Sequence, residues 1–167
     1  RRVLFRSIDE FKALFETNFF GIIRLIQEVG PTMREKGSGT IVNISSYAGR
    51  IGFPVSPAYT SSKFALEGLS ESLRLELAPF GVNVIIIEPG IVNTNFFKPM
   101  KMAKKLESDT AYKAITDKII LRIMSKVKLG IHPKEVAKTI LEAVKSEIPL
   151  PRYHVGDDAA QFLEARR

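Results

Sequence analysis

Apolar side chains recur at helical spacing in the first part of the chain. Between Ile8 and Val29 they fall three or four residues apart, with charged residues on the opposite face. This pattern predicts an amphipathic helix over residues 8 to 29, ended or kinked by Gly30 and Pro31. Asn18 lies inside the apolar stripe. A buried amide needs hydrogen-bond partners, so Asn18 is either a structural link or part of a site.

Two short β-branched runs follow, separated by one helical stretch. Residues 40 to 44 and 82 to 88 are bounded by turn residues, as buried strands are. Between them, Ser56 and Pro57 form a typical helix start, and the helix continues until Pro79 and Gly81. Glu67, Glu71 and Arg74 are expected on its wetter side. A strand, a helix and a strand of these lengths predict a βαβ unit with parallel strands and a right-handed crossover.

The last part of the chain is helical and only lightly patterned. Residues 112 to 127 and 133 to 145 predict helices, and residues 152 to 155 predict a final short strand. The fold class is therefore α/β, a partial doubly wound parallel sheet of three strands with flanking helices. Residues 93 to 130 fit either a solvated amphipathic segment or a lid that closes over a substrate.

Composition and charge narrow the class of protein. The chain has 167 residues, 45% hydrophobic and 26% charged, which is typical of one soluble globular domain. It has no cysteine and only two histidines, so we expect no disulfide and no metal site, and a cytoplasmic protein. The formal charge of +7 is concentrated in residues 98 to 128. That segment has a single aromatic residue, which disfavours a nucleic-acid partner. A basic membrane-surface protein is a further alternative, although we expect no membrane contact.

The first seven residues need separate treatment. They can be reverse-translated as AGA CGT GTG CTC TTC CGA TCT, part of a widely used sequencing adapter, and no initiator methionine is present. We interpret residues 1 to 7 as non-native and residues 8 to 167 as the carboxyl-terminal part of one domain. On this interpretation the chain continues upstream in its gene.

Three polar residues are predicted to meet at the carboxyl edge of the sheet. Ser46 follows a strand, and Tyr59 and Lys63 lie four residues apart near the start of the next helix. A tyrosine phenol titrates near 10, so its use as an acid or base at neutral pH requires roughly 4 kcal/mol of phenolate stabilisation. A nearby cation provides such stabilisation. An exposed tyrosine and a surface lysine would be the simpler interpretation of this spacing alone.

Taken together, these features closely resemble the short-chain dehydrogenase/reductase family over nearly all of residues 8 to 157. The resemblance is carried by Asn18-Phe19-Phe20-Gly21, Ile41-Val42-Asn43-Ile44-Ser45-Ser46, Tyr59-Thr60-Ser61-Ser62-Lys63 and Glu88-Pro89-Gly90-Ile91-Val92-Asn93-Thr94.

The resemblance implies a catalytic role for four of these residues. Tyr59 would be the general acid/base, and Lys63 would lower its pKa and bind the nicotinamide ribose. Ser46 would hold the substrate oxygen, and Asn18 would help to hold a water that links Lys63 to solvent. NAD or NADP would be the cofactor, contacted by Tyr59 and Lys63 and by the turn formed by Pro89, Gly90, Val92 and Thr94.

The sequence departs from the family pattern in one large respect. The Gly-rich loop Thr-Gly-x-x-x-Gly-x-Gly and the Asn-Asn-Ala-Gly motif are not among the 167 residues. We therefore expect this polypeptide alone to be inactive, and it gives no basis for choosing between NAD and NADP. The complete protein would be a homo-oligomer acting on a small carbonyl or alcohol. Phe53, Phe96, Phe97, Met100 and Met102 hint at an apolar one but would equally fit the core of a lid. The alternative is a non-enzymatic scaffold that self-associates through helices 8 to 29 and 56 to 79.

Overall fold

The computed structural model describes residues 7–97 and 110–157 and has an α/β fold. Three parallel strands form one sheet in the order β1 (Gly39–Ile44), β2 (Val82–Pro89) and β3 (Arg152–Val155). Ile41 pairs with Val84, and Ile87 pairs with Tyr153. The predicted parallel three-stranded sheet is confirmed. All three strands therefore end at one edge, where the predicted site residues were expected.

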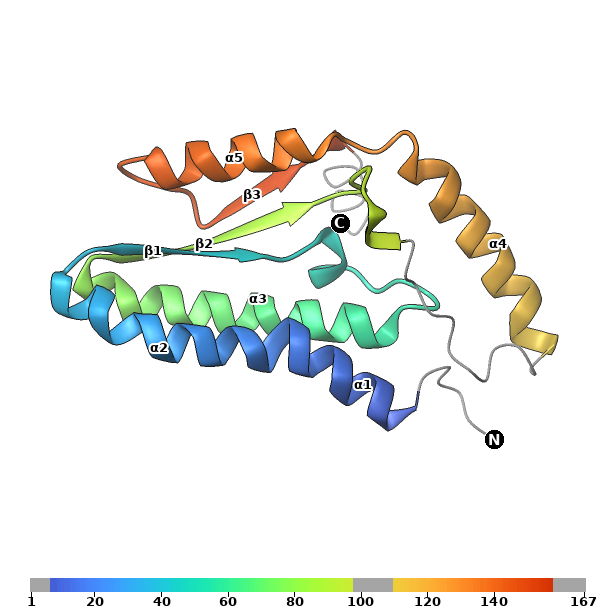
Figure 1. Ribbon diagram of the computed structural model, residues 1–167, viewed down its shortest axis with the longest axis horizontal. Helices are drawn as coiled ribbons and strands as arrows, with labels where there is room; N and C mark the ends of the chain where they lie inside the picture. Colours follow the sequence, from blue (N-terminus) through green and yellow to red (C-terminus); the bar gives the residue numbers. More distant parts are fainter. Residues whose placement is uncertain (1–6, 98–109, 158–167) are drawn as a thin grey trace.

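Helices cover both faces of this sheet (Figure 1). On one face lie α1 (Ile8–Phe15), α2 (Gly21–Lys36) and α3 (Pro57–Leu77). On the other face lies α5 (Pro133–Lys145), while α4 (Thr110–Val127) stands beyond the carboxyl ends of the strands. Short 3₁₀ turns, named η2 (Tyr47–Gly49), η3 (Ala78–Phe80) and η4 (Asn95–Phe97), complete the connections. The arrangement is the doubly wound one that the sequence predicts.

The first helix differs from its prediction in length and regularity. A π-helical turn, η1 (Glu16–Phe20), separates α1 from α2, and α2 continues through Pro31 to Lys36. Of the two predicted effects of Gly30 and Pro31, an end or a kink, the end was therefore wrong. Pro31 is exposed, so water can bind the carbonyl group that loses its N–H donor. The helix ends instead at Gly37, whose φ of 64° allows its N–H to bond back to the last turn.

The amino end of α1 is closed by a capping box. The Ser7 hydroxyl accepts a hydrogen bond from the Glu10 N–H at 3.2 Å, and the Ser7 N–H donates to the Glu10 carboxylate at 2.7 Å. Ser7 is the last of the seven residues set apart in the sequence, and here it is the cap of the first helix.

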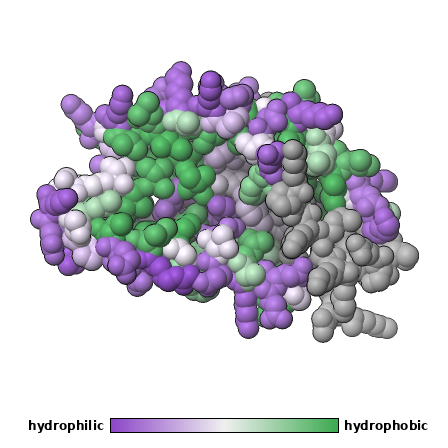
Figure 2. Space-filling model, in the orientation of Figure 1, coloured by the Kyte–Doolittle hydropathy of each residue, from purple (hydrophilic) through white to green (hydrophobic). Residues whose placement is uncertain are grey.

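The core forms two layers, one on each face of β2. Ile41, Val82 and Val84 pack with side chains of α2 and α3, whereas Ile85, Ile87 and Val155 pack against α5. The central strand is buried on both faces, as its continuous apolar run predicts. Apolar side chains also gather between the polar outer sides of α5 and α2 (Figure 2). Within the described ranges, no helix combines the length and the apolar character needed to cross a bilayer.

Candidate active site

Ser46 lies directly beyond the carboxyl end of β1 and is buried. Its backbone is extended, and its hydroxyl oxygen accepts a hydrogen bond of 3.1 Å from the Ala48 N–H, which caps η2. Since this bond uses an oxygen lone pair, the hydroxyl proton is available to a second partner. That partner is the phenol of Tyr59.

Tyr59 lies in the first turn of α3, which begins at Pro57 as predicted. Ser56 is the N-cap residue, but its hydroxyl makes no capping hydrogen bond. The ring of Phe96 meets the Tyr59 ring edge-on, with centroids 5.9 Å apart. Burial raises the pKa of the Tyr59 phenol, whereas the hydrogen bond with Ser46 lowers it. Burial is the larger effect, so the phenol is fully protonated at neutral pH.

Lys63 lies one turn further along α3, and its ammonium group points back toward β1. Its Nζ donates a hydrogen bond of 2.7 Å to the Ile44 carbonyl and lies 5.8 Å from the centroid of the Tyr59 ring. Burial lowers the pKa of Lys63 to about 8, while the charge of Glu67 acts in the opposite direction. Lys63 is therefore mostly cationic at pH 7. The structure thus brings Ser46, Tyr59 and Lys63 together at one sheet edge.

Asn18 contacts α3 through a hydrogen bond with Ser62. It lies in the π-helical turn η1, half-buried, and its amide donates a hydrogen bond of 3.1 Å to the Ser62 hydroxyl. Ser62 is fully buried and donates to the Tyr59 carbonyl at 2.8 Å. The interaction shown is a structural link between η1 and α3. The π turn itself, a local feature often found at functional sites, left no signal in the apolar periodicity.

The turn after β2 lies at the same edge. Pro89 ends the strand and is buried, and the Gly90 N–H donates to the Val155 carbonyl at 2.8 Å. Val92 forms an isolated parallel bridge with Ile131. Both hydrogen bonds of this bridge use the neighbours of Val92, so the N–H and C=O of Val92 point away from Ile131.

Thr94 follows this turn and is exposed. Its hydroxyl oxygen accepts a hydrogen bond of 3.2 Å from the Phe96 N–H. Because Phe96 also contacts Tyr59, the segment that carries Thr94 is joined directly to the phenol.

A cluster of buried charges behind α3 was missed by the sequence analysis. Glu67, expected on the wetter side of its helix, is only 5% exposed, and Glu88 is fully buried at the end of β2. Arg152 Nε lies 3.1 Å from Glu67 Oε2 and 3.5 Å from Glu88 Oε1. The glutamate that ends the apolar run of β2 was the available signal, because a charged side chain there must be paired.

The remaining members of this cluster lie at its rim. Arg50 Nη1 is 3.4 Å from Glu88 Oε1, and His154 Nδ1 is 2.5 Å from Glu88 Oε2. Glu71 pairs with the other side of the Arg152 guanidinium. Burial raises the pKa of Glu88 to about 7, with Glu67 adding to the effect and the two arginines opposing it. Burial and both arginines lower the pKa of His154.

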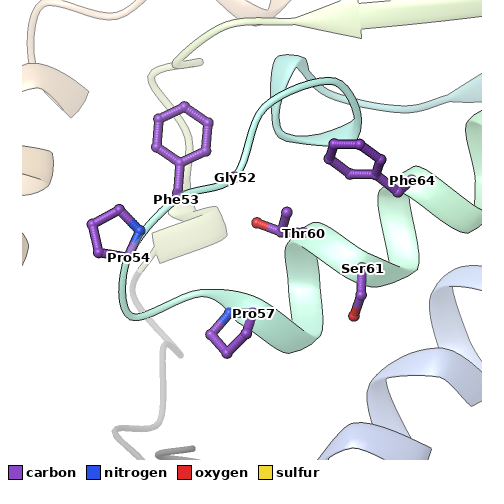
Figure 3. A pocket seen from close by; sticks show the side chains of 7 residues that line it. All are labelled: Gly52, Phe53, Pro54, Pro57, Thr60, Ser61 and Phe64. Carbon is purple, nitrogen blue, oxygen red and sulfur yellow. The ribbon is translucent and has the colours of Figure 1, made fainter.

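A separate open cavity of about 540 Å³ lies between α3 and the loop before it. Figure 3 shows Phe53 and Phe64 on two sides of it, with Thr60 between the loop and Phe64. Ser46, Tyr59 and Lys63 do not line this cavity, which faces another side of α3. Phe53 is the one aromatic residue of the expected substrate pocket found here. The Phe97 side chain, Met100 and Met102 lie outside the described residues.

The arrangement at the sheet edge suits proton transfer to and from an oxygen atom. It combines a protonated phenol, a hydroxyl that can donate to a phenolate and a nearby cation.

Comparison with known proteins agrees with this geometry. The family profile described as short chain dehydrogenase matches residues 3–105. An uncharacterized oxidoreductase of Bacillus subtilis, YusZ, is 39% identical over 152 residues, covering 89% of this chain and 54% of its own length. A 3-ketodihydrosphingosine reductase of Bacteroides thetaiotaomicron is 34% identical, covering 89% of this chain and 55% of its own length.

A solved structure also matches most of this chain. A short-chain dehydrogenase from Streptomyces avermitilis superposes with a TM-score of 0.82 and 36% identity, covering 97% of this chain and 58% of that one. The chain thus spans little more than half the length of each of these three proteins.

Proposed function

The chain belongs to the short-chain dehydrogenase family, and from this we propose that it is part of an NAD(P)-dependent oxidoreductase that reduces a carbonyl or oxidises a secondary alcohol. One observation carries the proposal. The Tyr59 phenol is hydrogen-bonded to Ser46, and the Lys63 ammonium lies 5.8 Å from its ring. These groups suit a general acid and base with its two supporting groups.

In the direction of carbonyl reduction, Tyr59 is the proton donor. Its raised pKa keeps the phenol protonated at neutral pH, as an acid requires. Ser46 holds and polarises the substrate oxygen. When Tyr59 has given up its proton, the Ser46 hydroxyl and the Lys63 ammonium stabilise the phenolate. In alcohol oxidation the same groups act in reverse, with the phenolate accepting the hydroxyl proton.

A nicotinamide cofactor, when bound, supplies or accepts the hydride. The residues present fit one end of such a cofactor. The N–H and C=O of Val92 form a donor–acceptor pair of the kind that a carboxamide can bind, and the turn that carries them begins at Pro89 and Gly90. Lys63 offers further N–H donors for a ribose hydroxyl, and Thr94 presents an exposed hydroxyl. No residue of the chain distinguishes NAD from NADP.

We propose a supporting role for Asn18. Through Ser62 it holds η1 against the turn of α3 that bears Tyr59. An amide in this place could also hold a water that reaches Lys63, as the family resemblance implies.

The substrate is proposed to be small and apolar, beneath a lid formed by residues 93 to 130, of which residues 98–109 lie outside the described part of the chain. Phe96, 59% exposed, contacts Tyr59, and α4 exposes Ile115, Leu121 and Met124. The name of the Bacteroides relative specifies a 3-keto substrate, which agrees with carbonyl reduction.

The 167-residue polypeptide by itself is proposed to lack turnover, since its sequence contains no Gly-rich phosphate loop. Titration of the isolated chain with NADH and NADPH, followed by calorimetry, tests this. Tight binding of either nucleotide would contradict the proposal.

The activity itself is tested in the gene product that contains this chain. We expect it to oxidise NADH or NADPH in the presence of at least one member of a panel of apolar ketones and aldehydes. Tyr59→Phe should abolish that turnover while leaving the circular dichroism spectrum unchanged. Turnover unaffected by Tyr59→Phe would refute the mechanism.

A second candidate is a non-enzymatic scaffold that self-associates through helices 8 to 29 and 56 to 79. Exposed apolar side chains on these helices favour it, with Leu25 and Leu75 each 67% exposed. Sedimentation of the paired variant Leu25→Glu and Leu75→Glu distinguishes the roles. A scaffold loses its function with its oligomer, whereas the enzyme loses its function with Tyr59.

A further inference from the structure

Two glutamate side chains are buried against each other behind the candidate site. Glu67 on α3 is 5% exposed and Glu88 at the end of β2 is fully buried, and both carboxyl groups contact one nitrogen, Arg152 Nε, at 3.1 and 3.5 Å. The remaining oxygens, Glu67 Oε1 and Glu88 Oε2, are buried and have no hydrogen-bond partner within the described part of the chain, and a proton on one carboxyl group would let it donate to the other. Two like charges this close in a buried place do not both ionise readily.

The surroundings identify which group keeps the proton. Arg152 lies 3.1 Å from Glu67 Oε2 but 3.5 Å from Glu88 Oε1, so the closer ion pair stabilises the charge of Glu67. Glu88 is the more deeply buried, at 0% exposed against 5% for Glu67, and burial disfavours the charged form of a carboxyl group. His154 Nδ1 lies 2.5 Å from Glu88 Oε2. The other charged groups facing the pair are Arg50, Glu71 and Lys63.

Glu67 also lies close to the candidate catalytic groups. It is four residues after Lys63 on α3, hence on the same side of the helix. It packs against Gly49, at the end of the turn that Ser46 caps. A Cβ atom added there would lie 3.0 Å from Glu67 Cγ and 2.7 Å from Ser45 Oγ. The Glu67 side chain therefore lies against the end of the turn that Ser46 caps and one helical turn from Lys63.

We propose that Glu67 and Glu88 share one proton, held by Glu88, and that the anionic Glu67 is a positioning residue that keeps Lys63 cationic beside Tyr59. This inference rests on the proposed function, in which the charge of Lys63 stabilises the Tyr59 phenolate. The titration properties agree with it. Burial brings the pKa of Glu88 up to about 7 and that of Lys63 down to about 8, and Glu67 raises both.

The experiment is a pair of NMR titrations on the 167-residue chain, without cofactor or substrate. Glutamate side-chain carboxyl ¹³C shifts report the acid pair, and the ¹³Cε shift of Lys63 reports its ammonium. In the unmodified chain we expect the Glu88 carboxyl to titrate near neutral pH. The Lys63 signal should show a second inflection where Glu88 titrates.

Two isosteric variants separate a positioning role from a structural one. Glu67→Gln should lower the pKa of Lys63 by roughly one unit, about a tenfold rise in its acid dissociation constant, because the nearest negative charge is lost. Glu88→Gln keeps the shape of the side chain and should leave the Lys63 pKa within about 0.3 units, because Glu67 and not Glu88 is the charge that acts on Lys63. Glu71→Gln is the control, since Glu71 pairs with the same Arg152 but is exposed.

The outcomes are decisive in either direction. Equal Lys63 shifts in Glu67→Gln and Glu88→Gln, or none in Glu67→Gln, would overturn the positioning role. Ionisation of Glu88 below pH 5 would overturn the shared proton. If Glu67→Gln fails to fold, the second inflection in the unmodified chain decides, and its absence refutes the coupling. Because no turnover is measured, failure of the proposed function would show separately, in the Tyr59→Phe assay.

Discussion

The side-chain amide of Asn18 donates a hydrogen bond of 3.1 Å to the hydroxyl of Ser62, across the boundary between η1 and α3. The Ser62 hydroxyl in turn donates a hydrogen bond of 2.8 Å to the Tyr59 carbonyl. The π-helical turn is thereby tied to the part of α3 that carries Tyr59 and Lys63. Removing the amide should loosen the docking of the two segments and leave each helix intact.

Asn18→Ala is expected to lower the free energy of unfolding by about 1–2 kcal/mol, since the buried Ser62 oxygen loses its donor. Chemical denaturation followed by circular dichroism measures this. Thr17→Ala is the matched control, because the exposed Thr17 hydroxyl bonds only to its own helix, at the Ala13 carbonyl. Equal stability of the two variants would contradict the linking role.

Tyr59→Phe is expected to reduce kcat of the gene product that contains this chain by roughly 10²–10⁴, the usual contribution of a general acid. Tyr153→Phe serves as the control. Its phenol oxygen accepts a hydrogen bond of 2.9 Å from the Leu150 N–H, and its ring packs in the core layer against α5, on the face of the sheet opposite α3. A loss of activity in both variants, or in neither, would count against proton transfer by Tyr59.

Lys63 predicts a dependence of stability on alkaline pH. Its pKa is about 8 in the folded chain and near 10.5 when unfolded, so between these values the unfolded state binds more protons. The contribution of Lys63 to stability therefore rises as pH increases from about 8 to 10.5.

The expected gain in the free energy of unfolding is of the order of 1–3 kcal/mol. It is measured as the difference in stability between the unmodified chain and Lys63→Met, from denaturation curves across this pH range. A difference that does not vary with pH would show that the Lys63 ammonium is not desolvated.

The adjacent serines Ser45 and Ser46 are expected to respond in opposite ways. The Ser45 hydroxyl is buried and has no hydrogen-bond partner among residues 7–97 and 110–157, so Ser45→Ala should be neutral or stabilising by up to about 1 kcal/mol. Ser46→Ala removes the acceptor for the Ala48 N–H and the partner of Tyr59. It should cost about 1 kcal/mol and also lower turnover. Thermal unfolding and steady-state assays on both variants test the contrast.

Two glycines offer a similar contrast in backbone conformation. Gly68 lies within α3 with open space around it, and Gly68→Ala should stabilise the chain by about 0.5–1 kcal/mol. Gly81 has a φ of 69°, and a Cβ atom there would collide with the Gly37 carbonyl oxygen. Gly81→Ala should therefore destabilise the chain by about 2 kcal/mol or more. Equal effects of the two changes on the denaturation midpoint would disprove this account.

The features that could be predicted from sequence are those set by neighbouring residues. The βαβ unit follows from its apolar runs and turn residues, and the meeting of Tyr59 with Lys63 follows from their spacing on one helix. The continuation of α2 through Pro31 could not be predicted in this way. It depends on the exposure of Pro31 and on the left-handed Gly37.

The buried charge cluster illustrates the other limit of local patterns. Glu67 was expected on the wetter side of α3 because charged residues usually lie there. Its partner Arg152 is 85 residues away in sequence, on a strand that reaches it only through the completed sheet. A pairing of this kind has no periodic signature in the sequence, because it depends on the tertiary fold.

The bond between Lys63 and the Ile44 carbonyl bears on the order of folding. It joins residues only 19 apart, so the loop that it closes carries a small entropic cost. Pairing of β2 with β1 must wait for the whole of α3, and β3 joins later still along the chain. We expect the end of β1, the turn at Ser46 and the start of α3 to assemble early. The ion pairs of Arg152 should form afterwards, when β3 joins the sheet.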